Sequence, residues 1–241
     1  MTPKFKVLDV FFYKGQSITS KAIRLLSSVR YGMPYKDCFS HIDLGYDEDH
    51  TFSAEAKGAE IVSTERIETT SKRDVIVYRY RKITQEQIDN FYKMVPEYEG
   101  RGYAFARYII DAAKIFSFVV FILGLLTGWM SLKFLLLFGI LFIALQLVYI
   151  FFKKKDKGTS DCSELVAIFL DELKLMPYFS SDPRNEFPNS QLSKMEMMRW
   201  YGLADIVATF DYDTKTWKEY PVGAKTIVRS TQFAFTKKEN K

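Results

Sequence analysis

The chain has 241 residues, of which 48% are hydrophobic and 26% charged, so it is neither a disordered chain nor a fibre. Its two cysteines and two histidines exclude a disulfide framework and are too few for a His/Cys metal cluster, so we expect no metal and no cofactor. The net charge of +5 gives little support for nucleic-acid binding.

Before residue 115 the pattern alternates between short strands and helices. The first strand is rich in Val and Phe, and the second helix begins after Thr84, where Gln87 completes a capping box. Strands are predicted at 6–13, 41–46, 51–56, 60–62 and 75–80, and helices at 17–30 and 84–95.

The most hydrophobic part of the chain is residues 115–152, which contain a single charged residue, Lys133. One straight helix of this length would measure about 57 Å, far more than the roughly 30 Å hydrocarbon core of a bilayer. A hairpin of two transmembrane helices, 115–130 and 134–152, fits better. Lysines and arginines gather outside this hairpin, so the positive-inside rule places the rest of the chain in the cytoplasm. The alternative is a buried helical hairpin within a soluble domain, against which its all-round hydrophobicity argues.

Residues 156–241 are predicted to begin with a helix capped by Ser160 or Asp161, followed by strands at 206–212 and 217–220. Neither 1–114 nor 156–241 looks self-sufficient, so we expect them to pack together as one α+β domain with the hairpin inserted. The lipid bilayer would be one partner of such a chain, and the hairpin is a candidate surface for homo-oligomerisation.

Cys162 lies at the start of the helix that follows the apolar stretch, in the segment TSDCSELVAIFL. A helix N-terminus presents unpaired N–H groups and a partial positive charge, which favour a thiolate and can hold an oxyanion. Cys162 is therefore the candidate nucleophile. Cys38 has no such position, and we interpret it as structural.

A cysteine nucleophile needs a general base, and the chain offers two histidines. His41 begins a predicted strand, whereas His50 lies in the charged run DEDH, which is typical of a solvated loop. We therefore predict that His41 is the base. The group that orients its imidazole is predicted to be Glu55 on the next strand, with Asp43, two residues from His41 on the same face, as the competitor.

Four short motifs follow one another along the chain: Ser40-His41, Glu55-Ala56, Gly102-Tyr103 and Cys162-Ser163-Glu164-Leu165. Together they resemble the circularly permuted NlpC-type (YiiX-like) papain-like cysteine hydrolases. The resemblance implies a small antiparallel sheet packed on helices, with Cys162 set against the strand that carries His41. It also implies that Ser163 and Tyr103 lie on the substrate and oxyanion side of the site. The chain departs from the family at Ala104 and Gln16, where members often carry Asp.

The residues and the resemblance together predict a membrane-anchored cysteine hydrolase or acyltransferase, which cleaves an amide or ester through a Cys162 thioacyl intermediate. Relatives of this type suggest either cell-wall peptides or lipid acyl esters as substrates. A site beside the cytoplasmic face of the bilayer favours the lipid-linked class. The alternative is a non-catalytic membrane or virion assembly or binding protein that retains the papain-like fold. A pore built from the hairpin is disfavoured, because its spans carry few polar side chains.

Overall fold

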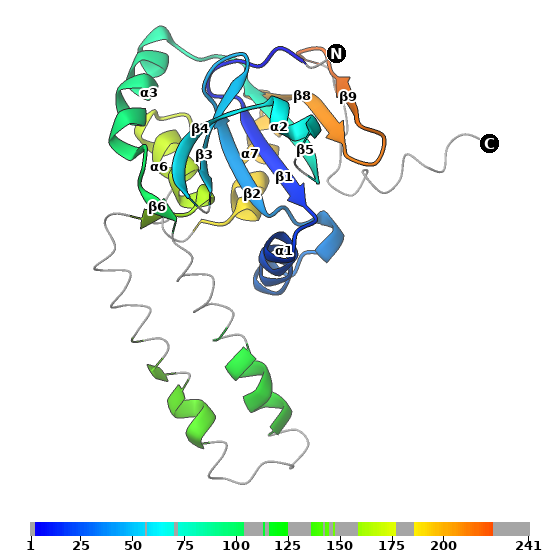
Figure 1. Cartoon of the computed structure of the whole chain (residues 1–241), viewed down its shortest axis with the longest axis vertical. Coiled ribbons are helices and arrows are strands. Elements are labelled where there is room, and N and C mark those ends of the chain that lie inside the picture. Colours follow the sequence, from blue (N-terminus) through cyan, green and yellow to red (C-terminus); the bar gives the residue numbers. More distant parts are fainter. Residues whose placement is uncertain are drawn as a thin grey trace, which may run out of the picture.

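Seven antiparallel strands form the central sheet in the order β4-β3-β2-β1-β5-β8-β9 (Figure 1). The computed structural model describes residues 3–55, 57–69, 72–103, 113, 116–124, 136–141, 143–144, 147, 159–176 and 186–223. Strands from both sides of the apolar stretch share this sheet, because β5 pairs with β8. The strands are β1 (Val10–Gly15), β2 (His41–Gly45), β3 (His50–Glu55), β4 (Gly58–Ser63), β5 (Arg73–Tyr80), β8 (Ala204–Asp211) and β9 (Thr216–Glu219).

Helices pack on both faces of the sheet. They are α1 (Ile18–Tyr31), α2 (Glu65–Thr69), α3 (Gln85–Tyr98), α6 (Cys162–Glu172) and α7 (Pro188–Trp200), and Tyr35–Asp37 forms a single 3₁₀ turn. Residues of α3, α6 and α7 share one core with alternate strand residues such as Phe12 and Ile42. Phe11 and Tyr13 belong to the other face, with Ile67 of α2. In Figure 1 α6 and α7 lie behind the sheet and α2 lies in front of it.

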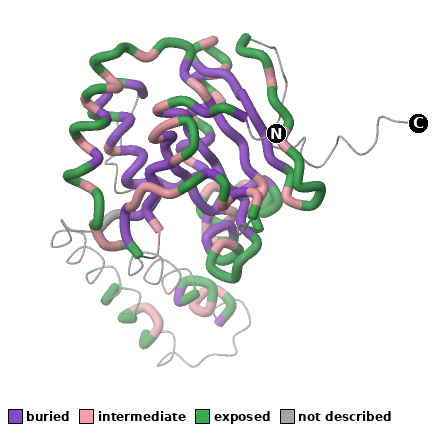
Figure 2. The backbone as a smooth tube through the Cα atoms, turned by 45° about the horizontal axis from the view of Figure 1, so that its top comes forward, coloured by how far each residue is buried: buried purple, intermediate pink, exposed green. Residues whose placement is uncertain are grey.

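The central strands are buried along most of their length, and exposed residues lie on the helices, on the loops and on β9 (Figure 2). The α+β class, with an antiparallel sheet packed on helices, is therefore confirmed. The capping box at Thr84 and Gln87 is also present, at the start of α3. One long element was not predicted: α7 occupies a segment in which the sequence pattern indicated no helix.

The prediction of two membrane spans is wrong. Within the part of the chain that the structure describes, no helix is long and apolar enough to cross a membrane. The longest described helical run of the apolar stretch is 116–124. Hydropathy over a long window measures composition and not helix length, which is why it misled the prediction. Residues 115, 125–135, 142, 145–146 and 148–152 of the predicted hairpin lie outside the described residues.

The ladder between β2 and β3 is paired at one end only, and this shapes the site. Its two pairs are Leu44–Phe52 and Gly45–Thr51. By contrast, β2 pairs with β1 as far as His41, the first residue of β2. α6 packs against both β2 and β3, so its first residue lies near the end of the sheet where these two strands are not paired.

Candidate active site

His41 sits at the first position of β2, and its side chain lies among polar groups of three strands. The β1–β2 register sets it opposite Tyr13, whose ring centroid is 5.5 Å from that of the imidazole. The imidazole Nε2 lies 2.9 Å from Ser53 Oγ and 2.7 Å from Asp43 Oδ1. His41 is 9% exposed and Asp43 is fully buried. One nitrogen of the ring is thus committed to β2 and β3, which leaves Nδ1 for any other partner.

That other partner is Cys162, the first residue of α6, whose side chain interacts electrostatically with His41 and raises the pKa of the imidazole. The helix begins there because Asp161 is its N-cap: the Asp161 carboxylate accepts from the N–H groups of Ser163 (3.0 Å) and Glu164 (2.9 Å). The Cys162 N–H is not among the donors that Asp161 binds. It is therefore the first-turn N–H best placed to hold an oxyanion formed at Cys162.

The contacts of His41 distinguish the two carboxylates that the sequence left in competition. Asp43 lies at hydrogen-bonding distance from the imidazole, whereas Glu55 Oε1 is 3.9 Å from Nε2. Glu55 is instead bound by two guanidinium groups, those of Arg66 at 2.8 Å and Arg73 at 3.6 Å. A distance of 3.9 Å is beyond a hydrogen bond. The geometry therefore favours Asp43 as the group that orients His41, with Glu55 as part of a surrounding ion-pair network.

The protonation of His41 follows from these neighbours. Burial lowers the pKa of the imidazole, but the negative charges of Asp43 and Cys162, with the hydrogen bonds to both, outweigh burial and raise the pKa to about 10. Burial raises the pKa of the Asp43 carboxyl, but His41, Arg66 and Ser53 together hold it well below its usual range. At neutral pH the site therefore holds an imidazolium between a carboxylate and the sulfur of Cys162.

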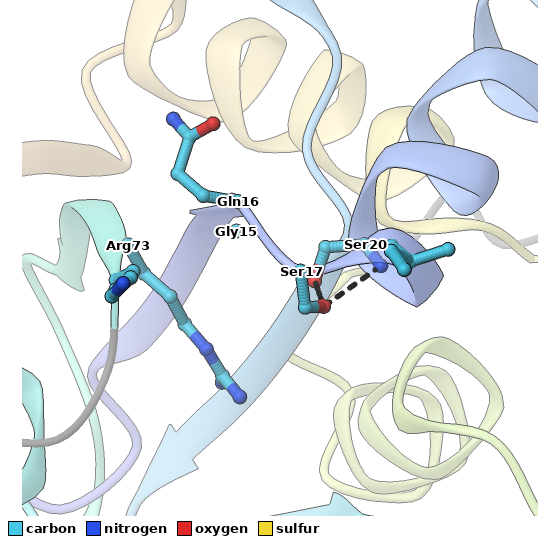
Figure 3. A pocket seen from close by; sticks show the side chains of 7 residues that line it. Gly15, Gln16, Ser17, Ser20 and Arg73 are labelled. Atoms are coloured by element: carbon cyan, nitrogen blue, oxygen red, sulfur yellow. Dashed lines mark hydrogen bonds between the residues drawn. The ribbon is translucent and has the colours of Figure 1, made fainter.

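A hollow of about 450 Å³ borders the site beyond the end of β1 (Figure 3). Its lining contains two cations and no acidic side chain: Gly15, Gln16, Ser17, Ile18, Ser20, Lys72 and Arg73. Gly15 N–H donates to Ser40 Oγ at 3.1 Å, and Ser40 directly precedes His41. In Figure 3 the side chains of Arg73 and of Ser17 and Ser20 lie on opposite sides of this space. The hollow thus carries two cationic side chains, of which Arg73 also pairs with Glu55, and it adjoins Ser40, the residue before His41.

The remaining sequence candidates have these positions. Ser163 donates its hydroxyl to Asp161 at 2.5 Å and to the Glu186 carbonyl at 2.9 Å, so its polar groups brace α6. Tyr103 pairs through its backbone with Ser160, two residues before Cys162, in a short parallel ladder of β6 (Gly102–Tyr103) and β7 (Thr159–Ser160). The Tyr103 side chain and Ala56 lie outside the part that the structure describes.

The two other residues weighed in the sequence lie in different surroundings. Cys38 is buried and its thiol donates to the Pro34 carbonyl at 3.5 Å, and burial raises the pKa of the Cys38 thiol. His50 pairs with Asp47 at 2.9 Å, and its side chain is 44% exposed. Neither arrangement offers a paired nucleophile and base.

Sequence reasoning missed four polar residues around the pair. Ser53 contacts His41, and Arg66 contacts Asp43. At the start of α7, Asn189 contacts the backbone of Phe39 and Gln191 contacts the backbone of Ser163. Only Ser53 had a signal, because it alternates with Phe52 and Ala54 and so shares a strand face with Glu55. Within the described residues, no group of three or more His, Cys, Asp or Glu side chains could hold a metal ion.

No family model matches the chain, and no curated protein matches its sequence.

Proposed function

We propose that the chain is a cysteine hydrolase or acyltransferase of the permuted papain-like, NlpC-type kind, with Cys162 as nucleophile, His41 as acid and base, and Asp43 as the group that orients His41. The observation that carries the proposal is the line of side chains from Cys162 at a helix N-terminus, through His41, to the buried Asp43. A nucleophile, a base and an orienting carboxylate in hydrogen-bond contact are what acyl transfer through a thioester needs. The resemblance of the four motifs is consistent with this assignment.

In the proposed reaction the Cys162 thiolate attacks the carbonyl carbon of an amide or ester. A carbon–sulfur bond forms, and the carbonyl electrons move to the oxygen, which the Cys162 N–H stabilises. The intermediate then collapses: the bond to the leaving group breaks, and the His41 imidazolium gives that group its proton. Neutral His41 next takes a proton from water or from an acceptor hydroxyl or amine, whose oxygen or nitrogen attacks the thioester. The carbon–sulfur bond breaks, and the thiolate and imidazolium are restored.

Two structural features bear on the substrate. The preference for lipid-linked substrates depended on a site beside a bilayer, and it loses its basis with the two membrane spans. The hollow beside His41 presents Lys72 and Arg73 and no acid, so we propose that it receives a negatively charged part of the acyl or leaving group. Peptide and lipid acyl compounds both remain candidate classes if they carry such a group.

A second candidate function is favoured by one observation: Cys162 is 0% exposed. A fully covered thiol suits a non-catalytic binding or assembly protein that keeps the papain-like fold. In the catalytic proposal, the side chains that cover the sulfur have to move before a substrate reaches it.

The deciding experiment is to incubate the full chain with p-nitrophenyl acetate and to follow both p-nitrophenol release and the mass of the intact protein. We expect turnover, with one acetyl group on the peptide that contains Cys162. Cys162→Ala should abolish both signals, whereas the matched variant Cys38→Ser should retain them. Absence of turnover and of any acetyl group on Cys162 would support the non-catalytic function instead.

A further inference from the structure

The start of α7 contacts the backbone on the His41 side of the site. Asn189, the second residue of α7, accepts a hydrogen bond from the Phe39 N–H at 2.8 Å and donates one to the Phe39 carbonyl at 3.1 Å. Asn189 and Phe39 are each 1% exposed. The amide thus binds one residue from both sides, as a neighbouring strand would, two positions before His41.

The same turn of α7 contacts the Cys162 side of the site. Gln191, which is fully buried, donates its side-chain N–H to the Ser163 carbonyl. Just before α7, the Glu186 carbonyl accepts the Ser163 hydroxyl at 2.9 Å. Ser163 follows Cys162 directly, so these contacts hold the first turn of α6.

The first turn of α7 therefore binds the backbone near His41, at Phe39, and the backbone next to Cys162, at Ser163. Asn189 and Gln191 are two residues apart, whereas Phe39 and Ser163 are separated by more than 120 residues along the chain. These bonds are buried, and a buried amide that loses its partner is costly, so each contact resists displacement.

The need for such a connection is visible in the sheet. β2 and β3 carry no backbone pairs at the His41 end, so the strand edge nearest Cys162 is not fixed by a ladder. β1 holds His41 from the other side, through the Tyr13–His41 pair and the bond from Ser40 N–H to the Tyr13 carbonyl at 2.9 Å. Neither contact involves α6, so neither fixes the position of His41 relative to Cys162.

We propose that Asn189 and Gln191 are positioning residues, which set the separation of Cys162 and His41 by binding both backbones from the first turn of α7. This inference rests on the proposed function, because a set separation matters only if the two side chains act as a pair. Displacement of reacting groups by about 1 Å can cost about 100-fold in rate.

The test is the pH dependence of Cys162 alkylation by iodoacetamide in the full chain, with the modified peptide identified by mass spectrometry so that Cys38 is counted separately. We expect Cys162 of the wild type to react faster at pH 7 than Cys162 of His41→Ala does. Asn189→Ala should lose at least about 10-fold in rate at pH 7 and move its pH profile toward that of His41→Ala. Asn189→Asp keeps the acceptor for the Phe39 N–H and loses the donor, so it should fall between wild type and Asn189→Ala.

Tyr78→Phe is the matched control. It removes the hydrogen bond between Tyr78 and Glu196 in the middle of α7, and so loosens the same helix without touching Phe39 or Ser163. We expect it to lower stability while the alkylation midpoint stays at the wild-type value. If Asn189→Ala does not fold, Gln191→Met, which keeps the size of the side chain and loses the donor to Ser163, takes its place and should shift the midpoint in the same direction.

Three results would overturn the inference. The first is a wild-type midpoint in folded Asn189 and Gln191 variants. The second is an equal shift in Tyr78→Phe, which would reduce the effect to general stability. The third is a wild-type rate at pH 7 no higher than that of His41→Ala, which would refute the proposed function and the positioning role with it.

Discussion

Asp43→Asn, set against Glu55→Gln, is the substitution that most directly tests how the site is built. Both changes remove a carboxylate charge and keep the shape of the side chain. Asp43 Oδ1 is 2.7 Å from His41 Nε2, whereas Glu55 Oε1 is 3.9 Å away. Only the shorter distance is a close ion-pair contact, within the range of a charge-assisted hydrogen bond.

The expected magnitudes follow from those distances. A hydrogen bond to a charged group contributes about 1.5–3 kcal/mol, which corresponds to about 10- to 150-fold in an equilibrium or a rate. Asp43→Asn should therefore lower the rate of Cys162 alkylation at pH 7, and of ester hydrolysis, by that factor. Glu55 is part-exposed and is bound by Arg66 at 2.8 Å, so Glu55→Gln should cost less than about fivefold.

The assay is the second-order rate constant for alkylation of Cys162 by iodoacetamide, measured from pH 5 to 10 by peptide mass spectrometry. His41→Ala gives the rate constant expected when the base is absent. Urea unfolding of each variant controls for loss of the native state. A Glu55→Gln rate as low as that of Asp43→Asn, or lower, would refute the assignment of Asp43 and restore the carboxylate that the sequence favoured.

Three further outcomes are expected. The raised pKa of His41 gives stability that is present below its ordinary value of 6.5 and is lost as pH rises through about 10. Between about pH 6.5 and 10, urea unfolding should show a loss of up to about 1.4 kcal/mol per pH unit, and this slope should vanish in His41→Ala. Arg73→Gln should raise the KM of a negatively charged ester and leave that of its neutral analogue unchanged; equal KM changes for both would remove the hollow from substrate binding. Asp161→Ala, which removes the cap of α6, should lower the free energy of unfolding by about 1 kcal/mol and slow Cys162 alkylation, and thermal unfolding unchanged from wild type would contradict the capping role.

The sequence predicted those helices and strands whose signals lie within a few consecutive residues. Alternation indicated β2, the run VIVYRY indicated β5, and Thr84 with Gln87 indicated the start of α3, because these signals are complete within a few residues. The start of α7 has such a signal in Pro188 at its first position. Its flanking sequence, SDPRNEFPNS, otherwise reads as a loop, and burial against the sheet is what makes the segment helical.

The choice between Asp43 and Glu55 was not available from the sequence. Strand alternation places both on the face of His41, but it does not show that β2 and β3 lack backbone pairs beside His41, nor that Arg66 of α2 reaches Glu55. Those facts depend on contacts between elements. The apolar stretch shows the reverse error, since a strong local signal of composition was read as a tertiary arrangement that the described helices do not support.

The position of α7 has a consequence for how the chain folds. During synthesis, β2 with His41 emerges first, and α6 with Cys162 follows more than 100 residues later. The first turn of α7, which contacts both sides of the site, emerges last of the three. β8, the partner of β5, emerges later still. Pairing between such distant segments is slow, because loop-closure entropy has to be overcome before the contacts form. A nascent chain that ends before residue 186 contains both the histidine and the cysteine and lacks the turn that aligns them, so reactivity should arise only as synthesis nears completion of the sheet.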